Sequence, residues 1–413
     1  MTPRTREDDK HNLSTLNMSK QAKLDVLGGI TAEQFITEYW QKKPLLIRQA
    51  FPDFQCPISA DELAGLAMEE EVEARIVSEH SDDGPWQPLN GPFDESNFAQ
   101  LPRTHWTLLI QQLDAWEPEI SDLKQHFNFI PNWRFDDIMA SYAPEGGSVG
   151  PHYDQYDVFL LQAEGRRHWR TGQMCDENSP RVEGTPLRIL RDFVENDNWI
   201  LEPGDMLYLP PNIAHYGVAL APDDEFGQCI TLSVGYKAPT HTQIVSHFTD
   251  YLLEQVKASS IYEDADLTRP KHQGEIPDAA LEKVKKILDQ YSQNPEYLKR
   301  WFGEFSTELK NEHSLEMLEE ALTEDDFNKL IAEDAFISAN EGSRFAYSLS
   351  EQGLLLFVDG QSIELMETAL KFVQRLCEMK ATPITQLLTL SNDPQCAQVT
   401  LDLLNQGNLY FGN

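Results

Sequence analysis

The sequence predicts a mainly β core, an antiparallel barrel or sandwich, with helical segments before and after it along the chain. Between residues 134 and 240, short runs rich in Val, Ile, Phe, Tyr and Leu alternate with Gly, Pro, Asn and Asp turns. Closely spaced short strands of this kind are typical of antiparallel β architectures. On both sides of this stretch, apolar residues recur at the three- and four-residue spacing of helices. The chain has 413 residues, so we expect about two or three domains.

Residues 1–25 mix charges of both signs and contain no apolar run. A secretory signal needs such a run, so we expect a mobile arm and, by default, a cytoplasmic location.

The segments between this arm and the β core combine helices with short strands. Thr31 and Gln34 have the spacing of a capping box, which indicates a helix that runs into the short strand KPLLIR. SADELAGLAMEE predicts a second capped helix, EVEARIVSE alternates like a half-buried strand, and THWTLLIQQLDAWEPEISDLKQHF has helical periodicity interrupted at Pro118. These last three segments are residues 59–70, 71–79 and 104–127.

The β core is expected to consist of short runs that are separated by turns. In order, the runs are DDIMASYAP (136–144), HYDQYDVFLLQ (152–162), RRHWRTG (166–172), NWILE (198–202), DMLYLPP (205–211), HYGVAL (215–220) and QCITLSVGYK (228–237). Alternate side chains of a strand face the same side of a sheet, so each run should turn one face inward.

After residue 240 the sequence predicts helices and a small winged-helix-like domain. Apolar residues have helical spacing in TQIVSHFTDYLLEQVKAS and DAALEKVKKILDQYSQ, and Asp359-Gly360 is a strong hairpin-turn signal. The expected organisation is therefore an arm over 1–25, a β-rich domain over 26–240, a helical segment over 241–302 and a winged-helix-like domain over 303–413.

Composition excludes several classes of function. The chain carries 33 basic and 68 acidic residues, a formal net charge of −35. Such a surface repels phosphates, so direct nucleic-acid binding is not expected, and no apolar stretch of about 18 residues indicates a membrane span. The charge would attract a basic protein partner, although solubility or a salty habitat explains it equally well. The 5 cysteines are scattered without a CxxC pair, so neither a disulfide framework nor a zinc-thiolate site is predicted.

A histidine and a carboxylate stand two residues apart at the start of an apolar run. On a strand, His152 and Asp154 would face one side of the sheet, with Tyr156 continuing that face. His215 follows the turn-rich segment EPGDMLYLPPNIA, which would fix the entry of its strand. Two histidines and one carboxylate on facing strands form the facial triad that binds non-haem Fe(II) and leaves positions open for chemistry. A lone strand histidine is more often an ordinary core residue, so the motif alone leaves both interpretations open.

Arg167 and Trp169 share one face of the next run, which places a guanidinium in the same barrel interior. A buried cation needs an anion, and no acidic residue alternates with Arg167 on that strand. Two partners fit: an internal carboxylate elsewhere in the fold, or the carboxylate of a small diacid cosubstrate, onto which the guanidinium would fork.

The run from Tyr142 to Thr171, with its HYD and GRRHW elements, and the later PGDMLYLPPNIAH together resemble the JmjC-type 2-oxoglutarate oxygenases. Within them the chain is similar to the bacterial ribosomal oxygenases that hydroxylate an arginine of large-subunit ribosomal protein sixteen, including in its opening FITEYWQKKPLLIR. The resemblance covers most of residues 30–240. It implies a double-stranded β-helix (cupin/JmjC barrel) core with flanking helices, a helical segment that pairs two subunits, and a C-terminal winged-helix-like domain.

Carried over residue by residue, the resemblance implies His152, Asp154 and His215 as ligands of Fe(II). It implies Arg167 for the distal carboxylate of 2-oxoglutarate and Ser141 as the hydroxyl partner. With 2-oxoglutarate and dioxygen as cosubstrates, the chain would be a homodimeric protein arginine hydroxylase that acts on a basic ribosomal protein.

An arginine target would favour carboxylates and aromatic faces at the mouth of the pocket. Glu145, Tyr153 and Asp157 lie close in sequence, but strand alternation predicts a solvated outer face for Tyr153 and Asp157.

Three other functions remain open. The same chemistry on a histidine or lysine of another protein is the nearest. A metal-dependent cupin enzyme that acts on a small molecule would turn over without 2-oxoglutarate. A non-enzymatic binding protein with a degenerate barrel would hold no metal.

Overall fold

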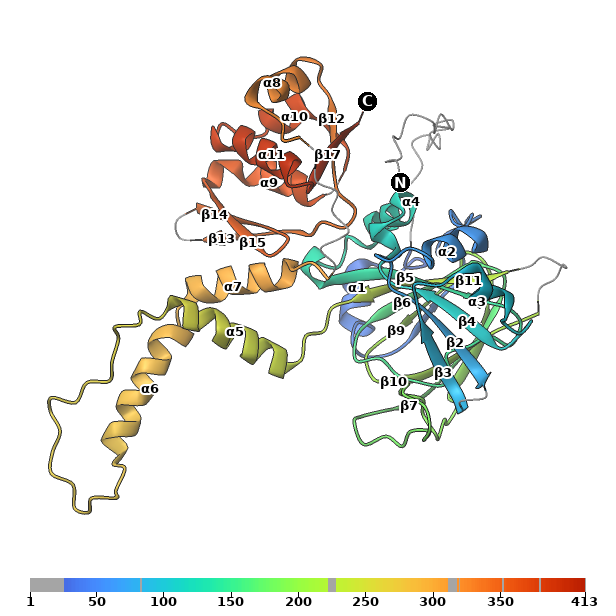
Figure 1. Ribbon diagram of the computed structural model, residues 1–413, viewed down its shortest axis with the longest axis horizontal. Coiled ribbons are helices and arrows are strands. Elements are labelled where there is room, and N and C mark those ends of the chain that lie inside the picture. The colour runs from blue at the N-terminus through green and yellow to red at the C-terminus, as the bar shows by residue number, and fades with distance from the viewer. Residues whose placement is uncertain are drawn as a thin grey trace.

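A β-rich body, a projecting helical arm and a C-terminal domain can be followed in the computed structural model (Figure 1). The residues that the structure describes are 26–81, 84–221, 228–310, 318, 320–350, 353–378 and 380–412. The arm expected over residues 1–25 lies outside them. None of the described helices is long and apolar enough to cross a membrane.

Two antiparallel sheets form the β-rich body. The larger has the order β1-β9-β6-β11-β5-β4-β2-β3 and the smaller the order β10-β7-β8. The strands of the larger sheet are β1 (Leu45–Ile47), β2 (Ala74–Ser81), β3 (Gly84–Asn90), β4 (Trp106–Ile110), β5 (Phe135–Ala143), β6 (Val158–Glu164), β9 (Met206–Leu209) and β11 (Cys229–Tyr236). Those of the smaller are β7 (Arg167–Met174), β8 (Asp197–Leu201) and β10 (Ile213–Ala219). The predicted mainly β core is therefore confirmed.

The two sheets face each other across a small apolar core. Its members come from both sheets: Val158, Leu160, Trp169, Leu201, Leu207 and Leu209. The inward faces of β6 and β7 therefore agree with the two-residue alternation read from the sequence.

Helices cover the other face of the larger sheet. They are α1 (Ala32–Glu38), α2 (Ala60–Leu66), α3 (Glu95–Ala99) and α4 (Pro118–Ser121). Both predicted helix starts are confirmed: the Thr31 hydroxyl accepts a hydrogen bond from the Gln34 amide at 3.0 Å, and Ser59 opens α2 with a reciprocal capping box. Phe35 of α1 is fully buried, and its ring lies 5.5 Å from that of Phe159 on β6.

The helix expected over residues 104–127 is wrong. Trp106–Ile110 forms β4, which pairs with β2 and β5, and only short helical turns follow it. Leu108 and Ile110 enter the main core, whereas Leu109 packs on the opposite side with Val77. A strand that is apolar on both faces has no alternation, so periodicity cannot separate it from a helix.

The chain after the body begins with α5 (His241–Gln255), α6 (Asp278–Ser292) and α7 (Pro295–Thr307). Figure 1 shows α5 and α6 as an arm that extends away from the body and from the C-terminal domain. Neither α5 nor α6 has a buried side chain.

The C-terminal domain contains two small sheets, β16-β12-β17 and β13-β14-β15, with helices between them. Its elements are α8 (Glu324–Ala332), β12 (Phe336–Ala339), β13 (Phe345–Ser350), β14 (Gly353–Val358), β15 (Gln361–Leu365), α9 (Leu370–Cys377), β16 (Thr382–Pro383), α10 (Ile384–Thr389), α11 (Gln395–Asn405) and β17 (Leu409–Gly412). The predicted hairpin is confirmed: Asp359 and Gly360 join β14 to β15 with φ of 47° and 79°, the two positive values of a type I′ turn.

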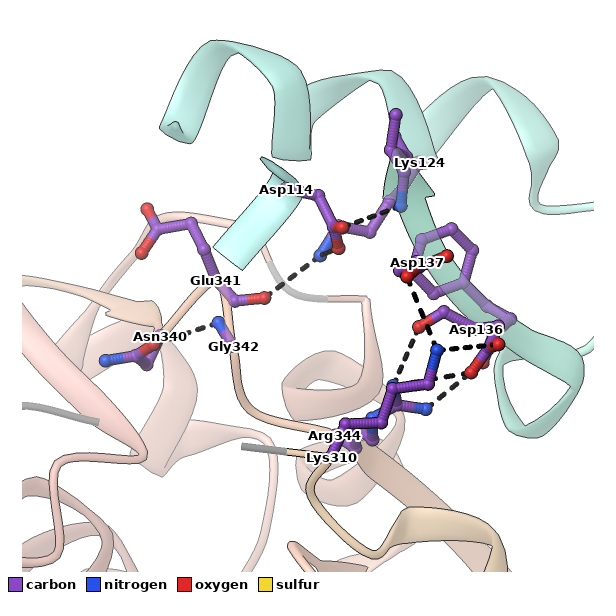
Figure 2. A network of polar contacts seen from close by, with 11 residues as sticks. Asp114, Lys124, Asp136, Asp137, Lys310, Asn340, Glu341, Gly342 and Arg344 are labelled. Carbon is purple, nitrogen blue, oxygen red and sulfur yellow. Dashed lines mark hydrogen bonds and ion pairs between the residues drawn. The ribbon is translucent and has the colours of Figure 1, made fainter. Parts of the chain in front are cut away.

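The C-terminal domain contacts the body at the start of β5. Arg344 donates hydrogen bonds to the carbonyls of Phe135 at 3.3 Å and Asp136 at 2.7 Å (Figure 2). The Asn132 side chain donates to the carbonyl of Cys377 at 2.8 Å. A cavity of about 480 Å³ lies between the two parts.

Candidate active site

His152, Asp154 and His215 converge in the β-rich body. One possible ligand atom of each lies within 4.8 Å of those of the other two. His215 belongs to β10, and His152 pairs with it through backbone hydrogen bonds of 3.0 and 2.8 Å. Asp154 Oδ2 lies 3.9 Å from Nε2 of His152 and 3.5 Å from Nε2 of His215. Side chains that are distant in sequence therefore form one group.

Asp154 is positioned by a turn rather than by a strand. β6 begins only at Val158, so the expectation that His152 and Asp154 share a regular strand is wrong. The carbonyl of Asp154 instead accepts a hydrogen bond of 2.7 Å from the amide of Asn212, the residue before β10. Asn212 has a φ of 67°, in the left-handed region that asparagine tolerates. The turn that contains Asn212 therefore brings Asp154 next to His215.

Both histidines present Nε2 to Asp154 because their Nδ1 atoms are engaged. Nδ1 of His152 lies 2.9 Å from the Gly150 carbonyl, and Nδ1 of His215 lies 3.0 Å from the Ile213 carbonyl. A carbonyl only accepts, so the proton of each neutral imidazole is on Nδ1, and the Nε2 lone pair is available to a metal. Burial, reinforced by the neighbouring His152, lowers the pKa of His215 to about 4, so this imidazole is neutral at physiological pH.

The donor set fits a ferrous ion better than a structural zinc ion. Two imidazole nitrogens and one carboxylate are the ligands of a facial triad with open positions. A structural zinc site is closed by four ligands and often uses thiolates. In the part of the chain that the structure describes, no fourth His, Cys, Asp or Glu joins the group.

Arg167 places its guanidinium inside the body, where no carboxylate of the described residues forms an ion pair with it. The residue is 4% exposed, and Nη1 donates a hydrogen bond of 3.1 Å to Ser141 Oγ on β5. Nε and Nη2 are buried with no hydrogen-bond partner among the described residues. Trp169, on the same face of β7, lies with its ring centroid 5.8 Å from the guanidinium carbon. An unpaired buried cation is costly, so the arrangement is suited to an external anion.

Comparison with known proteins identifies two family models along the chain. A JmjC domain matches residues 122–244, and a ROXA-like winged helix matches residues 288–410. The ribosomal protein uL16 3-hydroxylase of Escherichia coli strain K12 is 37% identical over 280 residues, which are 67% of this chain and 72% of that protein. The probable ribosomal oxygenase of Haemophilus influenzae is 33% identical over 384 residues, 91% of this chain and 93% of that protein. The chain belongs to the JmjC ribosomal oxygenases.

Solved structures agree with this assignment over nearly the whole chain. The X-ray structure of E. coli ycfD has a TM-score of 0.83 and 31% identity, and covers 93% of this chain and 99% of that chain. The structure of the E. coli ribosomal oxygenase in complex with cobalt and 2-oxoglutarate has a TM-score of 0.80 and 30% identity, with the same coverage. The resemblance inferred from the sequence and the C-terminal winged helix are both confirmed.

The loop of this oxygenase that carries Asp154 is anchored by a buried carboxylate. Asp157 is fully buried and accepts three hydrogen bonds. The donors are the Tyr208 hydroxyl at 2.6 Å, the Gln41 side chain at 2.9 Å and Nη2 of Arg134 at 3.2 Å. Arg134 is the one cation paired with Asp157 among the described residues.

The expectation that Tyr153 and Asp157 face solvent is wrong. Tyr153 is 7% exposed, and its hydroxyl donates a hydrogen bond of 2.6 Å to the carbonyl of Asp176. Alternation fails for both residues because they lie in a loop before β6. Glu145 is exposed.

Replacing Arg134 with alanine is expected to leave Asp157 buried without its cation. The free energy of unfolding should fall by about 3–5 kcal/mol, the usual effect of removing one partner of a buried pair. Denaturant titration measures this, with Arg191→Ala as control, because Arg191 forms an exposed pair with Asp192. That control should change stability by less than about 1 kcal/mol, and equal effects of the two variants would contradict the role of Arg134.

Asp137 is a residue of the strand β5 that the reasoning from the sequence passed over. Asp137 and Ser141, which is four residues further along β5, lie on the inward face of that strand. The Ser141 hydroxyl accepts the hydrogen bond from Arg167. Asp137 is 8% exposed. The charge of Asp154, burial and the charges of Asp137 and Asp136 all raise the pKa of the Tyr156 phenol. Residues separated by an even number of positions face the same side of a strand. The four-residue spacing between Asp137 and Ser141 is therefore the sequence signal that could have identified Asp137.

Proposed function

We propose that this oxygenase is a 2-oxoglutarate- and Fe(II)-dependent hydroxylase of ribosomal protein uL16. The observation that carries the proposal is the buried Arg167 guanidinium, whose Nε and Nη2 have no partner among the described residues, in the same β-rich body as the group formed by His152, Asp154 and His215. The name of the E. coli relative and the cobalt and 2-oxoglutarate of the E. coli structure support it.

The ferrous ion would be held by Nε2 of His152, a carboxylate oxygen of Asp154 and Nε2 of His215. The ion would supply dioxygen activation, in which 2-oxoglutarate is oxidised to succinate and carbon dioxide and one oxygen atom enters a substrate C–H bond. Both hydrogen-bonded Nδ1 atoms hold their imidazoles in the tautomer that the metal needs.

Arg167 would fork onto the distal carboxylate of 2-oxoglutarate, and the Ser141 hydroxyl would contribute a further hydrogen bond. Thr171 of β7 pairs with His215, and Arg167 lies four residues along the same face. Four residues of a strand separate the Cα atoms of Thr171 and Arg167 by about 13 Å, a distance that two side chains and a five-carbon diacid can span. The apolar residues between the sheets would exclude water from the reacting groups.

We further assign the target to an arginine, as the family resemblance implies. Asp137 is a mostly buried carboxylate on the inward face of β5, and Tyr156 follows Asp154 by two residues, so the two side chains would offer a guanidinium an ion pair and an aromatic face. The net charge of −35 would favour the approach of a basic protein.

The test is incubation of the purified protein with Fe(II), 2-oxoglutarate and uL16. The proposal expects succinate release that depends on uL16, with a mass gain of one oxygen atom that fragmentation assigns to an arginine. Modification of a histidine or lysine would keep the chemistry and overturn the arginine assignment. Turnover of a small molecule without 2-oxoglutarate would overturn the proposed function.

Replacing Arg167 with methionine is expected to raise the KM for 2-oxoglutarate by roughly 10- to 150-fold. This range corresponds to about 1.5–3 kcal/mol for a hydrogen bond to a charged group. Arg167→Lys should recover part of the loss, because an ammonium keeps the charge without the fork. Succinate release at varied 2-oxoglutarate measures the effect, and an unchanged KM in both variants would refute the assignment.

We propose that a second copy of the chain covers the arm. On α6, Leu281, Val284 and Leu288 lie on one helical face and are 56%, 44% and 63% exposed. On α5, Val245 and Leu253 are 64% and 66% exposed. Monomers rarely leave so much apolar surface uncovered, and a two-fold pairing of identical arms would bury it.

Charged residues on this face are expected to separate the dimer. The double variant Val284→Asp and Leu288→Asp should sediment as a monomer, whereas Lys286→Asp on the opposite face of α6 should not change the assembly. Analytical ultracentrifugation at several concentrations measures this. A wild-type monomer at all concentrations would contradict the pairing.

A further inference from the structure

We propose that Trp86 and Ile189 are positioning residues for the metal: they clamp Gly150, whose carbonyl orients the imidazole of His152. Both would act through this one glycine, which stands two residues before His152 in the sequence. The inference rests on the proposed function, because it takes His152 as a ligand of the ferrous ion.

The carbonyl of Gly150 decides how His152 is presented. It accepts the hydrogen bond from Nδ1 of His152 at 2.9 Å, which leaves Nε2 free for a metal. A neutral imidazole can carry its proton on either nitrogen, and the partner of one nitrogen decides which tautomer forms. A displaced carbonyl would therefore change both the direction of the ring and its tautomer.

Two side chains from distant segments press against the Cα atom of Gly150. A Cβ atom at this position would lie 2.9 Å from Cδ1 of Ile189, 3.2 Å from its Cγ2 and 3.3 Å from Cδ2 of Trp86. Ile189 is 2% and Trp86 8% exposed, and they share one apolar cluster with Val77 and Leu109. Gly150 also has a φ of 79°, which favours glycine. We call the two side chains the Trp86–Ile189 wall.

Hydrogen bonds hold the same stretch of backbone away from the wall. The amide of Gly150 donates a buried hydrogen bond of 3.0 Å to Oγ of Ser148, which is 1% exposed. The carbonyl of Pro151 accepts one of 2.7 Å from the amide of Leu190. The ring of Pro151 restricts its own φ. The wall therefore closes the remaining direction in which Gly150 can shift.

The backbone of Trp86 on β3 is strained where it meets this site. Its φ of 55° lies in the left-handed region, which a bulky residue rarely adopts. Such conformations persist only where the surroundings impose them, and they cluster at functional sites. The carbonyl of Trp86 accepts a hydrogen bond of 2.7 Å from Oγ1 of Thr185. Thr185, Ile189 and Leu190 all belong to residues 175–196, between β7 and β8. This one segment therefore holds both Trp86 and the backbone before His152.

The experiment removes the atoms closest to Gly150 with Ile189→Ala. Neighbouring groups collapse partly into such a cavity, so the Gly150 carbonyl should turn away from His152. Calorimetric titration of the purified protein with cobalt should show an affinity lower by ~10–100-fold, the usual effect of losing a group that orients a metal ligand. Ile189→Val lacks only Cδ1 and should lose less.

A second readout needs no metal. In the metal-free protein, the nitrogen chemical shifts of His152 report which ring nitrogen carries the proton. The wild type should show the Nδ1–H tautomer, whereas Ile189→Ala should show a mixture of the two tautomers. Loss of core packing alone would not change this ratio.

Leu109→Ala is the matched control. It removes the same number of carbon atoms from the same apolar cluster, but none of the three atoms nearest to Gly150 belongs to Leu109. Thermal unfolding should show that both alanine variants are destabilised. Only Ile189→Ala should change the cobalt affinity and the tautomer.

A double-variant cycle tests whether Ile189 acts through Gly150. Gly150→Ala alone should lower the cobalt affinity by at least ~10-fold, because its Cβ atom meets the wall. Ile189→Val removes the atom that lies 2.9 Å from that position. The combined variant should therefore bind cobalt more tightly than the product of the two single effects predicts.

Wild-type cobalt affinity and tautomer in Ile189→Ala, or independent effects in the cycle, would overturn the inference while the proposed function stands. If Ile189→Ala does not fold, Ile189→Val is judged by the same two readouts. Failure of the wild type to bind cobalt, or to release succinate with uL16, would instead refute the proposed function.

Discussion

Replacing Asp154 with alanine is expected to abolish metal binding and hydroxylation while the fold persists. The carboxylate of Asp154 converges with His152 and His215, whereas its loop is held by the Asn212 amide and by buried Asp157. Mutation of a residue that only orients a metal ligand typically lowers metal affinity by ~10–100-fold. Loss of a ligand itself should lower the affinity by more than that. Calorimetric titration with cobalt and uL16-dependent succinate release measure the two effects.

Asp192→Ala is the matched control for this variant. Asp192 is an exposed carboxylate paired with Arg191, so its removal should leave cobalt binding and turnover unchanged. Cobalt binding that survives in Asp154→Ala at wild-type affinity would place the metal elsewhere.

Replacing Asp137 with asparagine is expected to weaken catalysis and to stabilise the fold. The kcat/KM for uL16 should fall by roughly 10- to 150-fold, because a charge-assisted hydrogen bond is worth about 1.5–3 kcal/mol. Asp137 itself has a pKa raised from 3.8 to about 6 by burial, so between these values the folded state binds more protons than the unfolded state. The free energy of unfolding of the wild type should therefore decrease as pH rises through this window. The asparagine variant lacks the ionisable group and should not show this decrease.

The stability difference between wild type and Asp137→Asn has a defined pH dependence. At pH 7 the asparagine variant should be more stable by up to about 3 kcal/mol, from 1.36 kcal/mol per pKa unit, and the gain should disappear towards pH 4. Denaturant titrations at several pH values measure it. A variant that loses both stability and activity at pH 7 would show that Asp137 is structural rather than a residue for the substrate.

The sequence was informative where local chemistry alone sets the structure. The hairpin at Asp359-Gly360 needs two residues that tolerate positive φ, and the pair has them. The inward positions of Arg167 and Trp169 follow from alternation because β7 is a regular strand. The pattern of two histidines and one carboxylate singled out three side chains that the structure brings together, because few functions other than metal binding require that combination.

The sequence was misleading where tertiary contacts decide. The position of Asp154 depends on the Asn212 amide from a distant turn, and the burial of Asp157 depends on Arg134 and Tyr208. Alternation through such a loop predicts the wrong environment, although the three side chains that it singled out do converge. Lys310 lies 3.3 Å from Asp137, a contact between distant segments that no local pattern encodes.

The most direct test is a crystal structure of this chain with cobalt and 2-oxoglutarate. We expect the metal on His152, Asp154 and His215, with the distal carboxylate of 2-oxoglutarate paired with Arg167 and Ser141. A metal bound elsewhere, or a cosubstrate whose distal carboxylate lies away from Arg167, would contradict this expectation.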